Sequence, residues 1–193
     1  GFSYDDLFGS GRLLAFELKR IGFFEYCERK EVSLMGVCNG FQILTESGVF
    51  GEGVRLIANR GFGFTNRWVR LKGAGPLEGE EYTLSVRHGE GQLKRSESDW
   101  DEGVTPLLTY DDPDFDNGSV DRVAGLIAQR GRAKVVGLMP HPEVSMRLID
   151  SPNALGPEFP QETRRRLMEP EFDGFRLMKA LFGGPNDRKI QKE

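Results

Sequence analysis

The sequence predicts an α/β domain, and two kinds of pattern support this class. Short apolar runs at residues 32–37 and 135–139 have the length and composition of buried strands in a parallel sheet. Apolar residues recur at helical spacing in residues 10–21 and 172–182. With 193 residues, 38% of them hydrophobic, the chain can bury one substantial core. We therefore expect a single domain over residues 1–193.

The first part of the chain orders these elements as helix, strand, helix. Leu14, Leu18 and Ile21 share one face of the first expected helix. The strand that follows leads directly into a second helix over residues 40–46, which Gly48 should end. This strand and helix therefore meet in a tight corner.

The middle of the chain, residues 54–129, is richer in strand signals. The segments RWVRL, YTLSVR and VTPLLTY alternate or cluster strand-forming residues and are separated by Gly, Pro and Asp. The last helix should carry a stripe of Phe175, Met178 and Phe182. Before it, the Pro- and charge-rich stretch 150–170 should be a surface excursion with a short helix around ETRRRLM.

Composition excludes several classes of function. Lys and Arg total 26 against 30 Asp and Glu, a net charge of −4 without a basic block, so nucleic acid is not an expected partner. No stretch approaches the roughly 18 consecutive apolar residues that span a bilayer, and no basic, apolar leader opens the chain. We therefore expect a soluble protein without membrane contact. Cys27 and Cys38 fit neither a disulfide framework nor a zinc site, which favours a reducing cytoplasm and no metal.

Cys38 lies at the predicted corner, in the stretch MGVCNGFQIL. A residue in a sharp strand-to-helix turn points its side chain out of the sheet edge, and Gly36 and Gly40 would remove side chains that collide there. The helix N-terminus favours a thiolate, and the Asn39 N–H could hold an oxyanion. The stretch therefore indicates a nucleophile, although Cys38 could instead be a small buried apolar residue.

His141 is the expected base for this cysteine. Pro140 and Pro142 flank it and restrict the backbone after the expected strand 135–139. Glu143 lies two residues on, so in an extended segment it could project to the same side and accept from the imidazole Nδ1. Nucleophile, base and orienting carboxylate would then lie at the ends of two parallel strands, where open α/β sheets bind ligands.

Four segments, GVCNGFQIL, RHGEG, NGSVDRVAGLI and GLMPHPE, occur in an order that resembles one family. This family is the glutaminase part of phosphoribosylformylglycinamidine synthase, a class I glutamine amidotransferase of purine biosynthesis. The first residues, GFSYDD, are similar to the end of that family's oxyanion loop. The resemblance covers residues 1–143 and the final helix, and it implies a flavodoxin-like fold with a mostly parallel sheet and flanking helices. It also implies that this chain lacks the fold's first strands.

The resemblance implies a defined chemistry for the predicted triad. Cys38 would attack the side-chain amide of glutamine, His141 would protonate the departing ammonia, and Glu143 would orient His141. Water would then release glutamate from a γ-glutamyl thioester. The oxyanion hole would combine the Asn39 N–H with a backbone N–H of Gly1 or Phe2. The implied substrate-binding residues are Gln42, Arg87, His88 and Gly89.

Other interpretations stay open at this stage. Gln42 could face solvent, and His88 could be a hydrogen-bonded turn residue. The domain could be a degenerate, noncatalytic scaffold, or another cysteine hydrolase with a similar elbow. If the resemblance holds, the partner would be a synthetase subunit or domain that turns formylglycinamide ribonucleotide into formylglycinamidine ribonucleotide. That partner would carry ATP and magnesium, and no cofactor is expected in this domain.

Overall fold

The computed structural model describes residues 9, 11–61, 63–96, 100–146 and 172–183. Gly1 and Phe2, and the excursion expected over residues 150–170, lie outside the described residues. The helices are α1 (Arg12–Arg20), α2 (Phe23–Arg29), α3 (Asn39–Ser47) and α5 (Asp173–Phe182). The strands are β1 (Leu34–Val37), β2 (Val54–Ile57), β3 (Thr65–Gly73), β4 (Glu81–His88), β5 (Gln92–Arg95), β6 (Val104–Tyr110), β7 (Val123–Arg130) and β8 (Ala133–Leu138). Short 3-10 helices cover Gly75–Leu77, Val120–Arg122 and Pro142–Val144.

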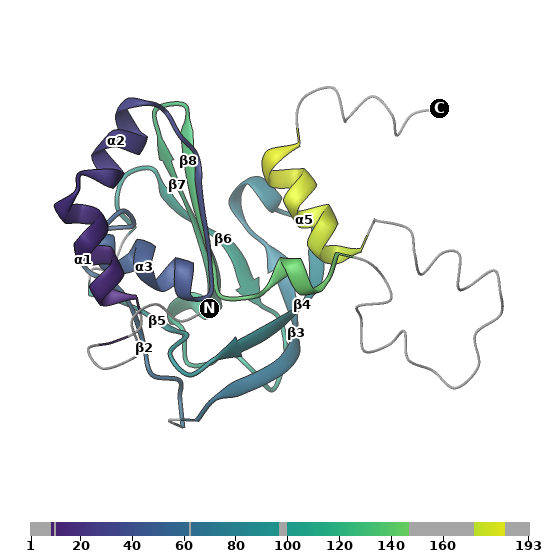
Figure 1. Ribbon diagram of the computed structural model, residues 1–193. Coiled ribbons are helices and arrows are strands. Elements are labelled where there is room, and N and C mark those ends of the chain that lie inside the picture. The colour runs from purple at the N-terminus through teal and green to yellow at the C-terminus, as the bar shows by residue number, and fades with distance from the viewer. Residues whose placement is uncertain (1–8, 10, 62, 97–99, 147–171, 184–193) are drawn as a thin grey trace, which may run out of the picture.

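The described strands form one large mixed sheet and one small sheet. The large sheet has the order β1, β8, β7, β6, β3, β4, and β2 pairs with β5 (Figure 1). β1 and β8 run parallel, as the sequence predicted, whereas the other ladders between these strands are antiparallel. The α/β class is confirmed, but the expected mostly parallel sheet was wrong. Hairpins such as β3 to β4 and β7 to β8 reverse the chain, and a reversal gives antiparallel pairing.

The large sheet curls so that its far edge returns to the chain beyond β8. The His141 N–H donates to the carbonyl oxygen of Ser85, in β4, at 2.8 Å. This contact is an isolated antiparallel bridge between the last strand in the sheet order and the segment after β8. The ends of β1, β8 and β4 consequently come together in space.

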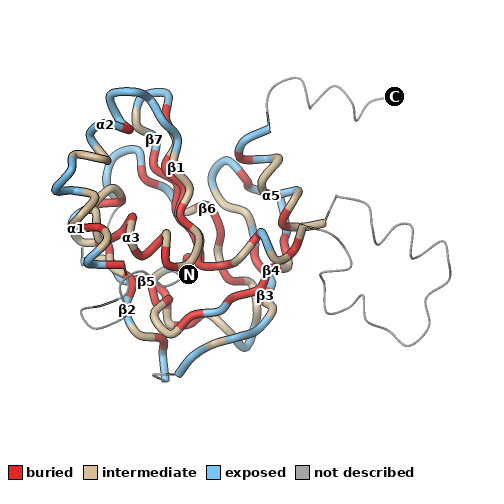
Figure 2. Tube along the Cα trace, in the orientation of Figure 1, coloured by how far each residue is buried: buried red, intermediate tan, exposed pale blue. Residues whose placement is uncertain are grey.

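Helices lie on both sides of the sheet. Figure 1 shows α1, α2 and α3 on one side of β7 and β8, and α5 on the other. Successive residues of β8 point to opposite sides: Val135 belongs to the core that contains Phe41 of α3, and Val136 to the core that contains Leu177 of α5. The continuous buried trace along the central strands in Figure 2 corresponds to these two cores.

The last helix forms where predicted but buries a different face. Gly174, Leu177 and Leu181 are its buried residues. Phe182, which the sequence placed on the apolar stripe, is 42% exposed. Gly174 sets the face, because a Cβ there would overlap the backbone carbonyl of Pro142, so this side of the helix packs against the chain that follows His141.

The N-terminal helices also differ in detail from the prediction. The helix expected over residues 10–21 is confirmed as α1, but its fully buried residue is Ala15, and Ile21 is 65% exposed. α2, which contains Cys27, was not predicted. β2, β5 and β7 fall in the strand-rich middle but were not individually predicted. No helix in the described part of the chain is long and apolar enough to cross a membrane.

Candidate active site

Cys38 occupies the turn between β1 and α3, as predicted. Its backbone angles, φ 53° and ψ −106°, are unusual for a residue other than glycine. Such a conformation costs about 1–3 kcal/mol and persists only where the surrounding structure imposes it. Cys38 is the N-cap of α3, next to helix N–H groups that lack intrahelical acceptors. The strand, cysteine and helix corner is therefore a strained elbow.

The two glycines near the elbow have different roles. A Cβ at Gly36 would overlap the backbone of Gly40 and come within 2.7 Å of Leu44 Cδ1. β1 and α3 can therefore approach closely only because residue 36 has no side chain. A Cβ at Gly40 would meet nothing within 4 Å, so the expected steric need for Gly40 is not found among its described neighbours.

Two strands that are distant in sequence hold Cys38 in place. Its backbone N–H donates to the Leu138 carbonyl at the end of β8, at 2.7 Å. Its thiol donates to the carbonyl oxygen of Arg87, in β4, at 3.4 Å. The curl of the sheet thus places the end of β4 against Cys38.

His141 and Glu143 form the contact that the sequence predicted. Nδ1 of His141 lies 2.5 Å from Oε1 of Glu143. The geometry differs from the extended segment expected, because Pro142–Val144 is a 3-10 helix that turns the carboxylate back toward the imidazole. The backbone bridge from His141 to Ser85 fixes the start of this turn.

The surroundings of His141 favour its charged form. The nearby Cys38 side chain, followed by the hydrogen bond to Glu143, outweighs burial and raises the pKa of His141 to about 9. Burial would raise the pKa of Glu143, but the hydrogen bond with His141 leads the opposing effects that lower this pKa overall. Nε2 of His141 is buried and has no partner at ordinary hydrogen-bond length among the described residues. The Cys38 thiol nevertheless lies close to the imidazole, because Cys38 contributes to the raised pKa of His141.

Gln42 is buried rather than facing solvent. Its Oε1 accepts from the side-chain amide of Asn39 at 3.0 Å, and its Nε2 donates to the Glu90 carbonyl at 2.7 Å. Gln42 therefore connects α3 to the segment after β4, and its predicted contact with substrate is not tested by this geometry. Asn39 is the first residue of α3, so the helix ladder leaves its backbone N–H without an acceptor.

The segment 87–89 faces Cys38 through its backbone. The Arg87 side chain is exposed, while its carbonyl accepts from the thiol. His88 is 1% exposed, and its Nδ1 lies 2.9 Å from Oδ1 of Asn59. Gly89 accepts through its carbonyl from the Asn59 backbone N–H at 2.9 Å. The predicted residues are thus together, whereas Gly1 and Phe2 lie outside the described residues.

Sequence reasoning missed Asn59, which anchors this segment. Asn59 follows β2 and is 2% exposed. A single asparagine between a strand and a Gly-rich loop normally indicates a turn, so the pattern gave no sign of a buried role.

Among the described residues, several buried polar atoms near the predicted triad have no hydrogen-bond partner. They are Ser85 Oγ, His88 Nε2, Tyr110 Oη and His141 Nε2. Burial raises the pKa of Tyr110, and Cys38 is the next contributor, so the phenol lies within electrostatic reach of the thiol. Buried polar atoms are nearly always partnered in native proteins. A cluster without partners is therefore typical of a site that binds a polar ligand.

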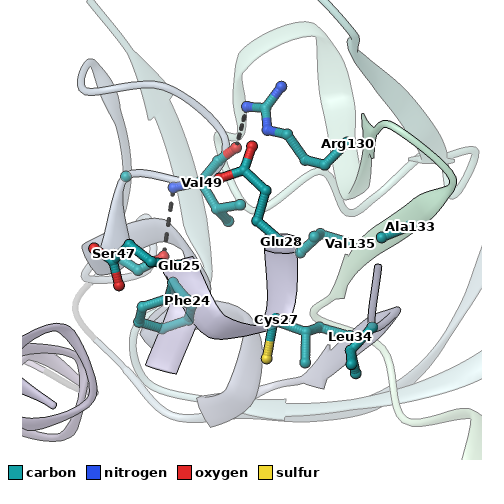
Figure 3. Close-up of a pocket in the computed structure, with 12 residues that line it drawn as sticks. Phe24, Glu25, Cys27, Glu28, Leu34, Ser47, Val49, Arg130, Ala133 and Val135 are labelled. Atoms are coloured by element: carbon teal, nitrogen blue, oxygen red, sulfur yellow. Dashed lines mark hydrogen bonds between the residues drawn. The ribbon is translucent and has the colours of Figure 1, made fainter. Parts of the chain in front are cut away.

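A separate cavity of about 230 Å³ lies away from the triad. Its lining includes Phe24 and Cys27 of α2, Leu34 of β1 and Val135 of β8, and none of the triad residues (Figure 3). Burial raises the pKa of the Cys27 thiol, which opposes thiolate formation. This agrees with the expectation that Cys27 is structural.

Within the described residues, no group of three or more His, Cys, Asp or Glu side chains could hold a metal ion. The expectation that this domain uses no cofactor stays a prediction.

Comparison with known families and proteins points in one direction. Residues 1–176 match the family described as the CobB/CobQ-like glutamine amidotransferase domain. The chain is 38% identical over 172 residues to the phosphoribosylformylglycinamidine synthase subunit PurQ of Rubrobacter xylanophilus, covering 81% of this chain and 73% of that protein. It is 36% identical over 151 residues to the subunit PurQ of Pyrobaculum aerophilum, covering 74% of this chain and 65% of that protein.

A solved structure agrees with these sequence matches. A chain in the structure of PurLQS from Thermotoga maritima is similar with a TM-score of 0.65 and 32% identity, over 78% of this chain and 69% of that one.

Proposed function

The chain belongs to the CobB/CobQ-like glutamine amidotransferase family and, within it, to the PurQ subunits of phosphoribosylformylglycinamidine synthase; from this premise we propose that it hydrolyses glutamine through a Cys38 thioester. The observation that carries the proposal is that the strained Cys38 elbow and the His141–Glu143 pair lie next to each other. The contribution of Cys38 to the pKa of His141 supports the closeness of nucleophile and base.

The proposed reaction has two steps. The Cys38 thiolate attacks the side-chain carbonyl carbon of glutamine, the carbon–nitrogen bond breaks, and His141 gives a proton to the departing ammonia. Water then attacks the γ-glutamyl thioester, His141 accepts its proton, and glutamate leaves with the thiolate restored. Glu143 holds Nδ1 of the imidazole, so Nε2 is the atom that exchanges protons.

Charge that develops on the carbonyl oxygen needs a nearby donor. The free N–H of Asn39, directly after the nucleophile, is suited to this role. We propose that a backbone N–H of Gly1 or Phe2 completes the oxyanion hole. Gln42, Arg87, His88 and Gly89 would bind the amino and carboxylate groups of glutamine.

The ammonia would serve a synthetase partner. We propose that this partner, with ATP and magnesium, converts formylglycinamide ribonucleotide to formylglycinamidine ribonucleotide. The names of the relatives and of the PurLQS structure support such an assembly. Two free thiols, Cys27 and Cys38, fit a reducing cytoplasm.

The noncatalytic alternative predicts different chemistry at Cys38. A scaffold would have no reason to keep a cysteine in a strained conformation beside a charged imidazole. Strain at a residue with φ of 53° is a cost that catalysis explains and a scaffold does not.

Covalent labelling tests the proposal. The chain is treated with a glutamine analogue that carries an electrophilic ketone in place of the amide, and the adduct is located by mass spectrometry. We expect one adduct, on Cys38, and protection by excess glutamine. Cys27→Ala should label like the parent, because Cys27 is structural.

Activity provides the second measurement. Cys38→Ala should release glutamate at less than about a hundredth of the parent rate, in the presence of the synthetase, with its unfolding free energy little changed. An unlabelled Cys38, together with no glutamate release above background by the parent or by Cys38→Ala, would support the scaffold instead.

A further inference from the structure

Asn59 makes more side-chain hydrogen bonds than its place after β2 suggests. Its Oδ1 lies 2.9 Å from each of three groups: the Gly91 backbone N–H, the Asn117 side-chain amide and Nδ1 of His88. Its Nδ2 donates to the carbonyl oxygens of Gly63 at 2.9 Å and His88 at 2.7 Å. One side chain therefore joins three segments of the chain: its own loop, residues 88–91 and Asn117.

The backbone groups fix the orientation of the Asn59 amide. The Gly91 N–H can only donate, so the atom facing it must be the oxygen. The carbonyl oxygens of Gly63 and His88 can only accept, so the atom facing them must be the nitrogen. An exchange of these two atoms would break all three contacts.

This orientation also fixes the tautomer of His88. Because Asn59 Oδ1 is an acceptor, Nδ1 of His88 must carry the hydrogen. Burial, followed by the charge of His141, lowers the pKa of His88 to about 4, so the ring is neutral near pH 7. Nε2 is then an acceptor, and it is buried without a partner in the described part of the chain.

The acceptor is buried close to the candidate site. His88 directly follows Arg87, whose carbonyl faces the Cys38 thiol at 3.4 Å. The effect of His141 on the pKa of His88 places the two imidazoles within electrostatic reach of each other. Nε2 is therefore an unsatisfied acceptor close to the site, and a donor group of a ligand bound against residues 87–89 would supply its missing hydrogen bond.

We infer that Asn59 is a positioning residue that holds His88 in the Nδ1–H tautomer, so that Nε2 accepts a hydrogen bond from the α-ammonium of bound glutamine. The carboxylate of glutamine has no hydrogen to donate at neutral pH, so it cannot take this place. The inference rests on the proposed function, since it concerns how that substrate is held.

The tautomer can be observed without any activity. The chain has only two histidines, so ring ¹⁵N spectra contain two imidazole pairs, and His88→Gln identifies those of His88. We expect a protonated Nδ1 and an unprotonated Nε2 for His88 between pH 6 and 8. An unprotonated Nδ1 in the parent would overturn the inference.

Two variants distinguish a specific effect on the His88 tautomer from a general effect on packing. Asn59→Leu removes the acceptor, so His88 should become a mixture of tautomers. Asn117→Gly is the matched control: it removes another donor to the same oxygen, and glycine tolerates the φ of 53° at that position. The control should keep the parent tautomer, and an equal change in both variants would contradict the assignment.

The substrate contact is tested by binding, in the Cys38→Ala background, where turnover does not interfere. Glutamine is compared with glutaramic acid, which has the same amide and carboxylate but no α-ammonium. With His88 present we expect glutamine to bind tighter by about tenfold or more. His88→Leu should reduce this preference to within about twofold, and a preference unchanged by His88→Leu would overturn the contact.

A pH profile gives the final readout. Asn59→Asp keeps an acceptor for Nδ1 but adds a negative charge, which should raise the pKa of His88. Below that new pKa, Nε2 would carry a hydrogen and repel the ammonium, so the preference for glutamine over glutaramic acid should weaken as pH falls. A preference that does not vary with pH would count against the inference.

The proposed function and this inference fail in different ways. Absence of glutamine binding in the Cys38→Ala chain, together with an unlabelled Cys38 in the parent, would reject the proposed function, while the tautomer result would stand on its own.

Discussion

The two histidines lie in neighbouring regions of one site but are held in opposite ways. His141 sits in the turn after β8 and contacts the Glu143 carboxylate, whose side chain is 59% exposed. His88 sits at the end of β4, fully buried against the neutral amide of Asn59. The pKa of His141 is raised to about 9, and that of His88 is lowered to about 4.

The difference shows that the partner and the burial, rather than the residue type, assign the role. A carboxylate and a nearby thiol stabilise an imidazolium, which can give a proton to a leaving group. A neutral amide in a buried setting stabilises an uncharged ring, which can only accept at its remaining nitrogen. The same side chain is thus held charged in one region, as the proposed acid–base chemistry requires, and neutral in the other.

Replacing each histidine with glutamine should give the largest difference in activity between the two positions. His141→Gln removes the proton donor, so kcat for glutamine hydrolysis should fall by about 10²–10⁴-fold. His88→Gln keeps an acceptor oxygen on a side chain of similar reach, so it should act mainly on KM, by less than about tenfold. Steady-state glutamate release, measured with the synthetase, checks both; equal losses in kcat would mean that both rings exchange protons.

Removing the charge of Glu143 should bring the pKa of His141 closer to that of His88. Glu143→Gln keeps an oxygen that accepts from Nδ1 but removes the charge that stabilises the imidazolium, so the pKa of His141 should fall. The kcat should drop on the order of 10- to 100-fold, as for partners that orient histidines in metal sites. The check is the pH dependence of kcat, and a loss as large as that of Cys38→Ala would show that Glu143 does more than orient the ring.

The two histidines should affect stability in opposite pH ranges. The folded pKa of His141 lies above the ordinary histidine value of 6.5, so its stabilising effect is present below pH 6.5 and is lost as pH rises through about 9. The folded pKa of His88 lies below 6.5, so its effect is present above pH 6.5 and is lost as pH falls through about 4.

Urea unfolding of the parent and of each histidine-to-glutamine variant, across pH 4–9, measures these effects by difference. The parent-minus-variant free energy should decline toward high pH for His141 and toward low pH for His88. The same slope for both residues would contradict the assigned charges.

The smallest effect is expected at Ser85, which joins the two regions. Its carbonyl accepts from the His141 N–H, while its buried hydroxyl has no partner in the structure. Ser85→Ala keeps the backbone contact and leaves no donor or acceptor unpaired. The unfolding free energy should therefore change by less than about 0.5 kcal/mol or increase. A loss above about 1 kcal/mol would show that the hydroxyl has a structural partner in solution.

The elbow could be read from the sequence because its parts are contiguous. An apolar strand, Gly36, Cys38 and a helix start follow one another, and local sterics decide the turn. The pairing of His141 with Glu143 was also predicted, but for the wrong reason, since a 3-10 turn rather than an extended segment brings them together. Side chains two residues apart can be in contact in both geometries, so the predicted contact was correct although the predicted backbone conformation was not.

The apolar face of the last helix shows where periodicity fails. Phe175, Met178 and Phe182 are at helical spacing and are bulky, so they were the expected core. The structure buries Leu177 and Leu181 instead, because Gly174 on the same face permits close contact with the backbone at Pro142. Periodicity identifies a helix, whereas the shape of its neighbour selects the face.

The sequence by itself determined the α/β class, the parallel pairing of β1 with β8, the Cys38 elbow and the contact of His141 with Glu143, because each depends on residues close along the chain or on a shared strand edge. Only the tertiary structure decided the mixed sheet, the curl that brings β4 to Cys38, and the burial of His88 against Asn59. These features depend on contacts between segments tens of residues apart, and hydrogen-bond partners at such separation leave no periodic signal. The conformation of Cys38 was therefore decided locally, while the burial and the neutral state of His88 were set by the fold.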